Sequence, residues 1–191
     1  MKLRLGPTER LYPMPTPLVV AGTGDKLGIM AVAWIAIAGS TPASVVMAIR
    51  KTRHTLALIR ETGEFTVNVP SVALAEAVDY CGLVSGRSTD KFADTGLTPG
   101  HSHTVGTPVV EECALSFECR VMSEVPNGEY VLVIGEILET QVDEAIIDEA
   151  GRIDVDALDP LVYIPHTREY RGLGPKVADA FKIGKGVVPK Q

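Results

Sequence analysis

The chain has 191 residues, of which 46% are hydrophobic and 22% charged, with a net charge of −6. This length predicts one domain, 1–191, and the apolar content excludes global disorder. The acidic balance argues against nucleic acid as a partner, because phosphate backbones require a broad basic field. The longest unbroken apolar run, Ile29–Ala38, falls short of the roughly 20 residues needed to cross a membrane, so we expect no membrane partner.

Compartment is indicated by the first residues and by the cysteines. Met1–Pro13 has no apolar core of the kind found in secretory signals. The three cysteines are odd in number and have no metal-like spacing. We therefore expect reduced thiols and a cytoplasmic protein.

The first half of the chain reads as short strands separated by turns. Leu18–Ala21, Ile29–Ala38 and Val45–Ile49 are apolar runs typical of strands. The turns between them are predicted at Gly22–Gly28 and Gly39–Pro42. This spacing favours antiparallel strands of a barrel or sandwich.

Helices are predicted next. Thr55 is expected to cap a helix that runs to Thr62 and stops at Gly63. After a strand at Phe65–Val69, a second helix is expected from Ser71 to Cys81, ended by Gly82. One short helical turn is expected at Asp90–Thr95.

The second half contains a strong hairpin signal. Cys113–Ser123 alternates, with Glu118 on the face opposite the apolar side chains, which predicts a half-buried strand. Asn127–Gly128 predicts a tight turn into a partner strand, Tyr130–Glu139. Three later segments are expected to be an exposed excursion, a last strand and a loose tail: 143–157, Leu161–Ile164 and 175–191. Mainly β structure with flanking helices, an antiparallel barrel, fits this pattern.

Three short motifs bear on ligand binding. Gly22, Gly24 and Gly28 resemble a dinucleotide fingerprint only superficially, because a strand and not a helix is predicted next. Arg50–Thr55 concentrates basic residues just before a predicted helix, where free N–H groups and the helix dipole favour a phosphate. A solvated basic turn is the alternative. The loop Ser85–Arg87, with Lys91 nearby, is a weaker candidate for an anion pocket.

Other chemistry is poorly supported by the residues. His101 and His103 alternate on one segment but have no evident third ligand, so no metal site is expected. No Gly-x-Ser-x-Gly elbow is present. No catalytic side chain is predicted.

An ordered set of short runs resembles the flavin reductase-like family, specifically its flavoredoxin branch. The runs are Tyr12–Pro15, Ala31–Trp34, Ile49–Thr55, Glu61–Asn68, Asp79–Gly82, Ser85–Arg87, Asp90–Phe92, Thr95–Leu97, Glu118–Cys119, Ile134–Glu136 and Pro160–Tyr163. They span residues 12 to about 174 in family order.

This resemblance implies an FMN-binding split antiparallel β-barrel that works as a homodimer. It implies an oxidoreductase in which flavin carries the chemistry and NADH or NADPH supplies electrons. The alternative is a non-enzymatic flavoredoxin-type carrier that serves an electron-transfer protein. With the basic run, the expected cofactor-binding residues are Trp34, Arg50, Lys51, Arg53, Thr55, Ser85, Lys91, Tyr130 and Tyr163.

Two positions depart from the family pattern. Gly28 stands where the family often has Asn, and Tyr130 where it often has His. Tyr130 keeps a hydroxyl but has a reference pKa near 10, so it does not titrate near neutral pH. Both departures bear on redox tuning and not on the phosphate site.

Overall fold

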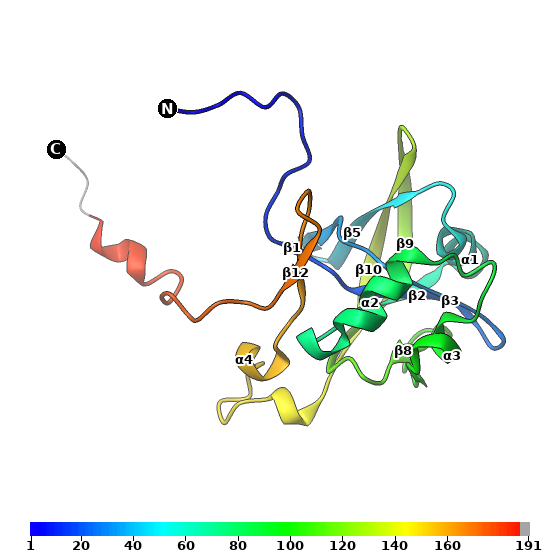
Figure 1. Cartoon of the computed structure of the whole chain (residues 1–191). Coiled ribbons are helices and arrows are strands. Elements are labelled where there is room, and N and C mark those ends of the chain that lie inside the picture. The colour runs from blue at the N-terminus through cyan, green and yellow to red at the C-terminus, as the bar shows by residue number, and fades with distance from the viewer. Residues whose placement is uncertain (188–191) are drawn as a thin grey trace.

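The computed structural model describes residues 1–187 and is dominated by one seven-stranded antiparallel sheet. Its order is β3-β2-β6-β9-β10-β5-β4. These strands are β2 (Leu18–Thr23), β3 (Lys26–Ala31), β4 (Ile35–Ser40), β5 (Ala43–Arg50), β6 (Glu64–Val69), β9 (Leu115–Asn127) and β10 (Tyr130–Val142). Figure 1 shows the curled sheet with helices α1, α2 and α3 on its flank.

The sheet has to curl, because its two edges are neighbours in sequence. Six strand spacings would separate β3 from β4 by about 29 Å in a flat sheet. The segment 32–34 joins these strands and reaches at most about 15 Å from Ala31 to Ile35. The edges therefore meet without pairing, and the barrel stays open along this seam.

The predicted single strand Ile29–Ala38 is wrong for the same reason. It is two strands, β3 and β4, at opposite sheet edges. The break falls at Val32–Trp34, where Val32 N–H donates to Pro17 O at 3.0 Å and Ala48 N–H donates to Trp34 O at 2.9 Å. The whole segment Ile29–Ala38 is apolar, so its sequence does not show that the first part pairs with β2 and the second with β5. The predicted turn Gly22–Gly28 is likewise mostly strand, with only Gly24 and Asp25 as the turn.

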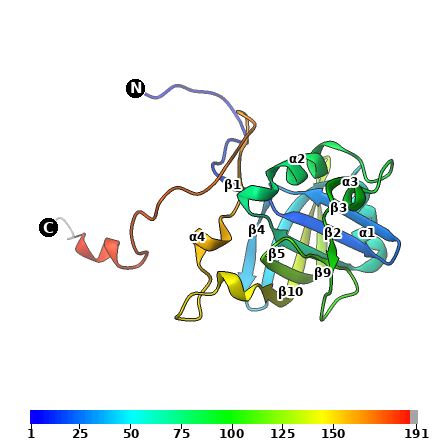
Figure 2. The ribbon, with the colours of Figure 1, turned by 60° about the horizontal axis from the view of Figure 1, so that its bottom comes forward.

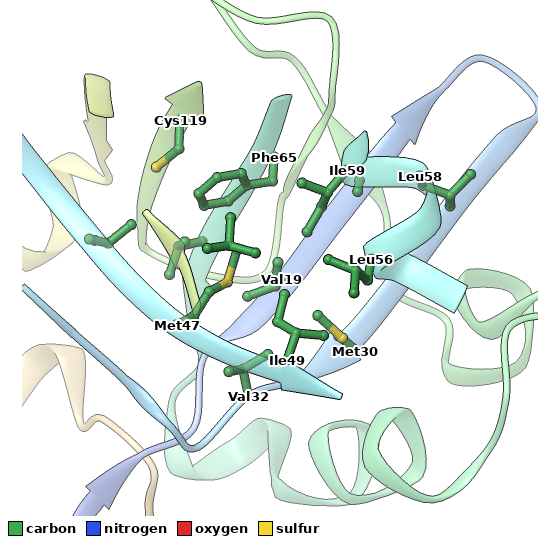
Figure 3. Packing of buried hydrophobic residues seen from close by; sticks show 14 of the residues in the cluster. Val19, Met30, Val32, Met47, Ile49, Leu56, Leu58, Ile59, Phe65 and Cys119 are labelled. Atoms are coloured by element: carbon green, nitrogen blue, oxygen red, sulfur yellow. The ribbon is translucent and has the colours of Figure 1, made fainter. Parts of the chain in front are cut away.

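The core lies inside the curled sheet and under the first helix, α1 (His54–Thr62). Figure 3 shows Met47 and Ile49 of β5 facing Val19 of β2, Phe65 of β6 and Leu56 of α1. These side chains are at most 2% exposed. The Gly63 stop is confirmed: Gly63 has φ 71° and its N–H caps Ile59 O. The Thr55 cap is wrong, since Arg53 is the N-cap and Thr55 lies inside the helix.

A second core packs α2 (Ala75–Leu83) and α3 (Lys91–Thr95) on β2 and β3. The predicted Ser71–Cys81 helix is a 3₁₀ turn, η1 (Val72–Leu74), followed by α2, and Gly82 does not end it. The start of α3 agrees with the predicted helical turn, because the Asp90 carboxylate accepts from Phe92 N–H and Ala93 N–H. The remaining strands are β7 (Pro99–Gly100), β8 (Val109–Val110), and a small sheet of β1 (Met14–Pro15), β11 (Val162–Ile164) and β12 (Glu169–Arg171).

The predicted hairpin is confirmed, but its turn lies one residue later than expected: Asn127 ends β9 and pairs with Tyr130, so the two turn residues are Gly128 and Glu129. The expectation that Glu118 faces solvent is wrong. It is fully buried, because loop 101–107 covers this end of β9. Its carboxylate accepts from His103 N–H at 2.8 Å, Thr104 N–H at 2.6 Å, Thr104 Oγ1 at 2.6 Å, Val105 N–H at 3.2 Å and Gln141 Nε2 at 2.7 Å.

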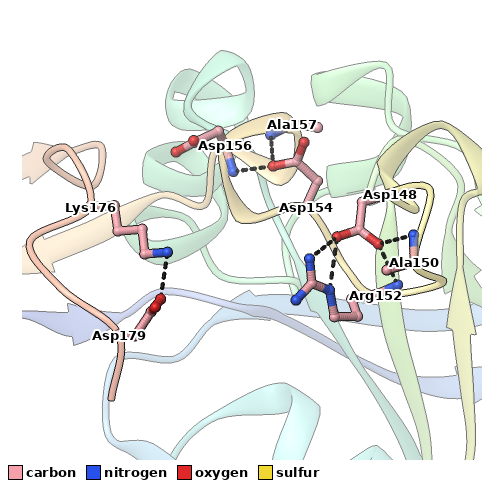
Figure 4. Close-up of polar contacts among 8 residues, drawn as sticks. All are labelled: Asp148, Ala150, Arg152, Asp154, Asp156, Ala157, Lys176 and Asp179. Carbon is pink, nitrogen blue, oxygen red and sulfur yellow. Dashed lines mark hydrogen bonds and ion pairs between the residues drawn. The ribbon is translucent and has the colours of Figure 1, made fainter. Parts of the chain in front are cut away.

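The excursion 143–157 contains η2 (Glu144–Ile146) and the start of α4 (Val155–Leu158), and is held mainly by local polar contacts. Figure 4 shows Asp148 bound to Arg152 and Asp154 capping α4. Only Ile146 in this range is fully buried.

Both ends of the described chain leave the barrel (Figures 1 and 2). Every residue in 1–13 and in 171–187 is exposed. A short 3₁₀ turn, η3 (Ile183–Gly186), lies in the second arm. The predicted tail extends over 175–191, of which 188–191 lie outside the described residues. Within residues 1–187, no helix is long and apolar enough to cross a bilayer.

Candidate functional site

Two adjacent pockets open beside the seam between β3 and β4, where the ends of β3 and β5 and the segment 32–34 face each other. The smaller has a volume of about 130 Å³ and lies at the start of α1. The larger, of about 620 Å³, extends past the small sheet of β1, β11 and β12. Met30, Arg50 and Arg53 line both, so the two pockets are adjacent and share these side chains.

The smaller pocket combines a helix N-terminus with cationic side chains. Thr52, Arg53, His54 and Thr55 come from the start of α1. No side chain caps this helix, so its first-turn N–H groups remain available to a ligand. Backbone N–H groups and the positive end of the helix dipole favour an anion here.

Lys91 contributes a buried positive charge to this pocket. Its side chain enters from α3 and is 6% exposed. Nζ donates to Ile29 O at 3.0 Å and Cys81 O at 2.7 Å, which leaves one of its three donors. No carboxylate of residues 1–187 lies within 4.0 Å of Nζ. Burial lowers the pKa of Lys91 from 10.5. An anion in the pocket would neutralise this uncompensated charge.

A second unsatisfied group lies beside it. Nδ1 of His54 is buried and has no hydrogen-bond partner in the described part of the chain. Gly28 and Gly86 flank it: a Cβ on these glycines would lie 3.5 Å and 3.2 Å from Nδ1. A Cβ on Gly28 would also lie 2.7 Å from Leu58 Cδ1. Glycine therefore permits the close approach of β3 to the start of α1.

Aromatic side chains line the larger pocket. Trp34 from the seam and Tyr130 from β10 meet edge to face, with ring centroids 5.4 Å apart. The Arg50 guanidinium lies 5.1 Å from the centroid of Tyr130. Tyr163 of β11 and Tyr170 of β12 lie 5.6 Å apart. Such walls suit a flat conjugated ring.

Tyr170 is fixed by a carboxylate that also lines this pocket. Its hydroxyl donates to Asp79 Oδ1 at 3.1 Å. Burial, together with this bond, raises the pKa of Tyr170 to about 12. The hydroxyl therefore remains protonated in the neutral range and holds Asp79 in place.

Eight of the nine predicted cofactor-binding residues line one pocket or the other. Thr55, Ser85 and Lys91 line the smaller, Trp34, Tyr130 and Tyr163 the larger, and Arg50 and Arg53 both. Lys51 lines neither. It is exposed, and its N–H donates to Glu129 O at 3.0 Å.

The structure adds residues that sequence reasoning missed. Thr52 and His54 lay inside the basic run and could have been included. Tyr170, His166 and Arg168 gave no local signal, because the strand that carries or follows them, β12, was not predicted.

Comparisons with known proteins agree with this architecture. Residues 10–174 match the model of the flavin reductase like domain. The chain belongs to the flavin reductase-like family. The flavoredoxin of Desulfovibrio vulgaris (Miyazaki F) superimposes with a TM-score of 0.91 and 37% identity, covering 96% of this chain and 100% of that one.

Two further relatives extend the picture. A protein of Archaeoglobus fulgidus is 36% identical over 148 residues, 78% of this chain and 82% of its own. A flavin reductase with a split barrel domain from Shewanella frigidimarina shares the fold at 24% identity and TM-score 0.79, covering 88% of this chain and 85% of that one. This flavin reductase-like protein is thus mainly β with a split antiparallel barrel, as predicted. Its family supports a flavin-binding, oxidoreductase-type function.

Proposed function

We propose that this protein is an FMN-dependent oxidoreductase that takes electrons from NADH or NADPH. Bound FMN would supply the redox chemistry, since its ring can accept a hydride from a reduced nicotinamide, which leaves as the oxidised pyridinium. The carrying observation is that the two pockets lie side by side and share Arg50 and Arg53. One site thereby offers an anion-binding end and an aromatic end.

The smaller pocket is assigned to the phosphate. Arg53, Thr55 and Lys91 supply donors and charge, with Arg50 and Ser85 at the rim. Free N–H groups at the start of α1, the spare Lys91 donor and the unpartnered His54 Nδ1 support this assignment. A phosphate oxygen suits the N–H groups and Lys91, and a protonated phosphate or a ribityl hydroxyl suits an accepting Nδ1.

The larger pocket is assigned to the isoalloxazine ring. Trp34, Tyr130 and Tyr163 border it. No side chain has to act as a nucleophile or general acid. The residues of this chain bind and orient the ring.

Flavin affinity tests the phosphate assignment. Arg53→Ala should weaken FMN at least about tenfold while riboflavin, which lacks the phosphate, changes little. Lys51→Ala is the matched control, because it removes a neighbouring charge that lines neither pocket, and should leave both affinities unchanged. Equal weakening of FMN and riboflavin by Arg53→Ala would place the phosphate elsewhere.

A second function, that of a non-enzymatic electron carrier for a protein partner, is favoured by the similarity to flavoredoxin. Steady-state oxidation of NADH or NADPH by the FMN-loaded protein separates the two. Turnover with a small acceptor supports the enzyme, and its absence with intact FMN binding supports the carrier.

We propose one domain over 1–191 that forms a cytoplasmic homodimer with the flavin near the interface. The exposed arms carry apolar side chains such as Leu3, Leu5, Val177 and Phe181, which a second copy could cover. All three cysteines are free, which supports a reducing compartment. Sedimentation should give about twice 20.4 kDa. A monomer that holds FMN at full affinity would contradict the dimer.

A further inference from the structure

We propose that the β11–β12 turn, Pro165–Arg168, binds the pyrophosphate of the nicotinamide donor, with Arg168 as its main contact. This inference rests on the proposed function, because it assigns the second reactant of the same site. The turn lines only the larger pocket. In Figures 1 and 2 the β11–β12 hairpin and α1 lie on different sides of the barrel, so the turn is separate from the phosphate end of the flavin site.

Backbone strain in the turn is the first observation. His166 has φ 76° and Arg168 has φ 57°, a region in which glycine is relaxed and other residues are strained. The conformation is held by Arg168 N–H, which donates to Ile164 O at 3.1 Å, and by the buried Pro165. The sequence thus places two side chains that line the pocket where glycines would be sterically easier. Strain of this kind is typical of ligand clamps.

Charge is the second observation. Within residues 1–187, Arg168 has no carboxylate within 4.0 Å, although eight other basic residues do. His166 accepts a hydrogen bond from Arg10 Nη2, 3.0 Å from its Nε2, which brings a second guanidinium to the turn. Of the two carboxylates that line this pocket, Asp79 is bound by Tyr170. Glu9 remains as a negative charge in the pocket that would repel a phosphate group.

Aromatic residues in the same pocket indicate which kind of molecule would bring an anionic group to Arg168. Tyr163 and Tyr170, on the two strands joined by the turn, line this pocket with ring centroids 5.6 Å apart, and Trp34 lines it as well. A flat ring that carries an anionic group matches a pocket lined by both aromatic rings and guanidinium groups. A guanidinium fork binds two phosphate oxygens at once. A reduced nicotinamide dinucleotide has both parts, and it gives the flavin one hydride, two electrons with one proton, as it becomes the pyridinium.

The test uses FMN-loaded protein and two donors, NADH and the uncharged 1-benzyl-1,4-dihydronicotinamide. Arg168→Gly removes the guanidinium and relaxes the backbone. We expect kcat/KM for NADH to fall about tenfold through KM, with the benzyl donor unchanged. The dissociation constant of NAD⁺, measured by calorimetry, should rise by a similar factor, and Tm should hold or increase. Arg168→Lys should restore part of the affinity.

The controls separate this inference from its basis. Arg171→Ala removes a charge from the same hairpin, paired with Glu169 at 2.6 Å, and should change neither donor. Glu9→Gln should lower the KM for NADH. Unchanged NADH kinetics in Arg168→Gly, or equal losses with both donors, would overturn the proposal. Failure of the proposed function would be seen separately, as wild-type protein without flavin absorbance, and the NAD⁺ titration would still decide the role of Arg168.

Discussion

Loop 101–107 and the pocket at the start of α1 both contain buried polar groups, but they satisfy them to different degrees. The Glu118 carboxylate accepts five hydrogen bonds that fasten the loop to β9. Lys91 has no counter-ion and His54 Nδ1 has no partner in residues 1–187. Buried polar groups are normally paired, so the satisfied Glu118 cluster marks structure, and unsatisfied groups that line a pocket mark a place for a ligand. Thr107 Oγ1 in loop 101–107 is also buried without a partner in the described residues, but it lines neither pocket.

The largest expected effect is at Glu118. Glu118→Ala leaves several buried donors without an acceptor, and the free energy of unfolding should fall by at least about 3 kcal/mol. Urea denaturation measures it. Glu124→Ala on the same strand removes a surface pair with Arg60 and should cost about 1 kcal/mol or less. Similar losses in the two variants would contradict the contrast between the regions.

Acid should remove the stabilisation that the ionised Glu118 carboxylate gives to the wild-type protein. Burial alone would raise the pKa of Glu118, but its bonds from His103, Thr104 and Gln141 outweigh burial and lower the pKa from 4.5 to about 2. A lowered carboxyl pKa stabilises the fold above pH 4.5, and this stabilisation is lost as pH falls toward 2. Unfolding free energy, followed by urea titration at several pH values, should drop by about 3 kcal/mol more in wild type than in Glu118→Gln.

Replacement of Lys91, unlike that of Glu118, should weaken flavin binding and leave the stability of the apo-protein nearly unchanged. In Lys91→Met, relief of a buried charge offsets the two lost bonds, so unfolding of the apo-protein should change by less than about 1 kcal/mol. The FMN dissociation constant should rise at least about tenfold. Denaturation and flavin fluorescence titration measure the two quantities. A large loss of apo-protein stability would make Lys91 a structural residue like Glu118.

His54 should give the smallest effect. His54→Phe keeps a ring but removes the unpartnered nitrogen, so apo-protein stability should hold or rise by up to about 1 kcal/mol. FMN affinity should fall a few-fold, as read by the same titration. Destabilisation of the apo-protein would show that Nδ1 already serves the fold.

Local sequence signals predicted much of the fold. The helix stop at Gly63 and the hairpin signalled by Asn127–Gly128 act over a few residues and were found, the hairpin turn to within one residue. The basic run was also local, and Arg53 and Thr55 reach the pocket. Trp34, Lys91, Tyr130 and Tyr163 come from distant elements, and only the family resemblance placed them together.

The errors have a common physical origin in long-range contacts. Glu118 looks like a solvent-facing residue of an alternating strand until loop 101–107 covers it. Ile29–Ala38 looks like one strand because both halves are apolar, although they pair at opposite edges. Tyr170 and Arg168 lie near the site only because β12 pairs with β11.

The open seam between β3 and β4 also has a mechanical consequence. No backbone hydrogen bonds pair the two edge strands, so within the described residues the segment 32–34 joins them. A ligand in the larger pocket would add contacts beside this segment. A ligand that contacts both Met30 and Ala31 of β3 and Ala48 to Arg50 of β5 would cross-link these strands beside the seam. Amide hydrogen exchange in β3, β4 and β5 should then slow on binding, while exchange in β9, far from the seam in the strand order, stays the same.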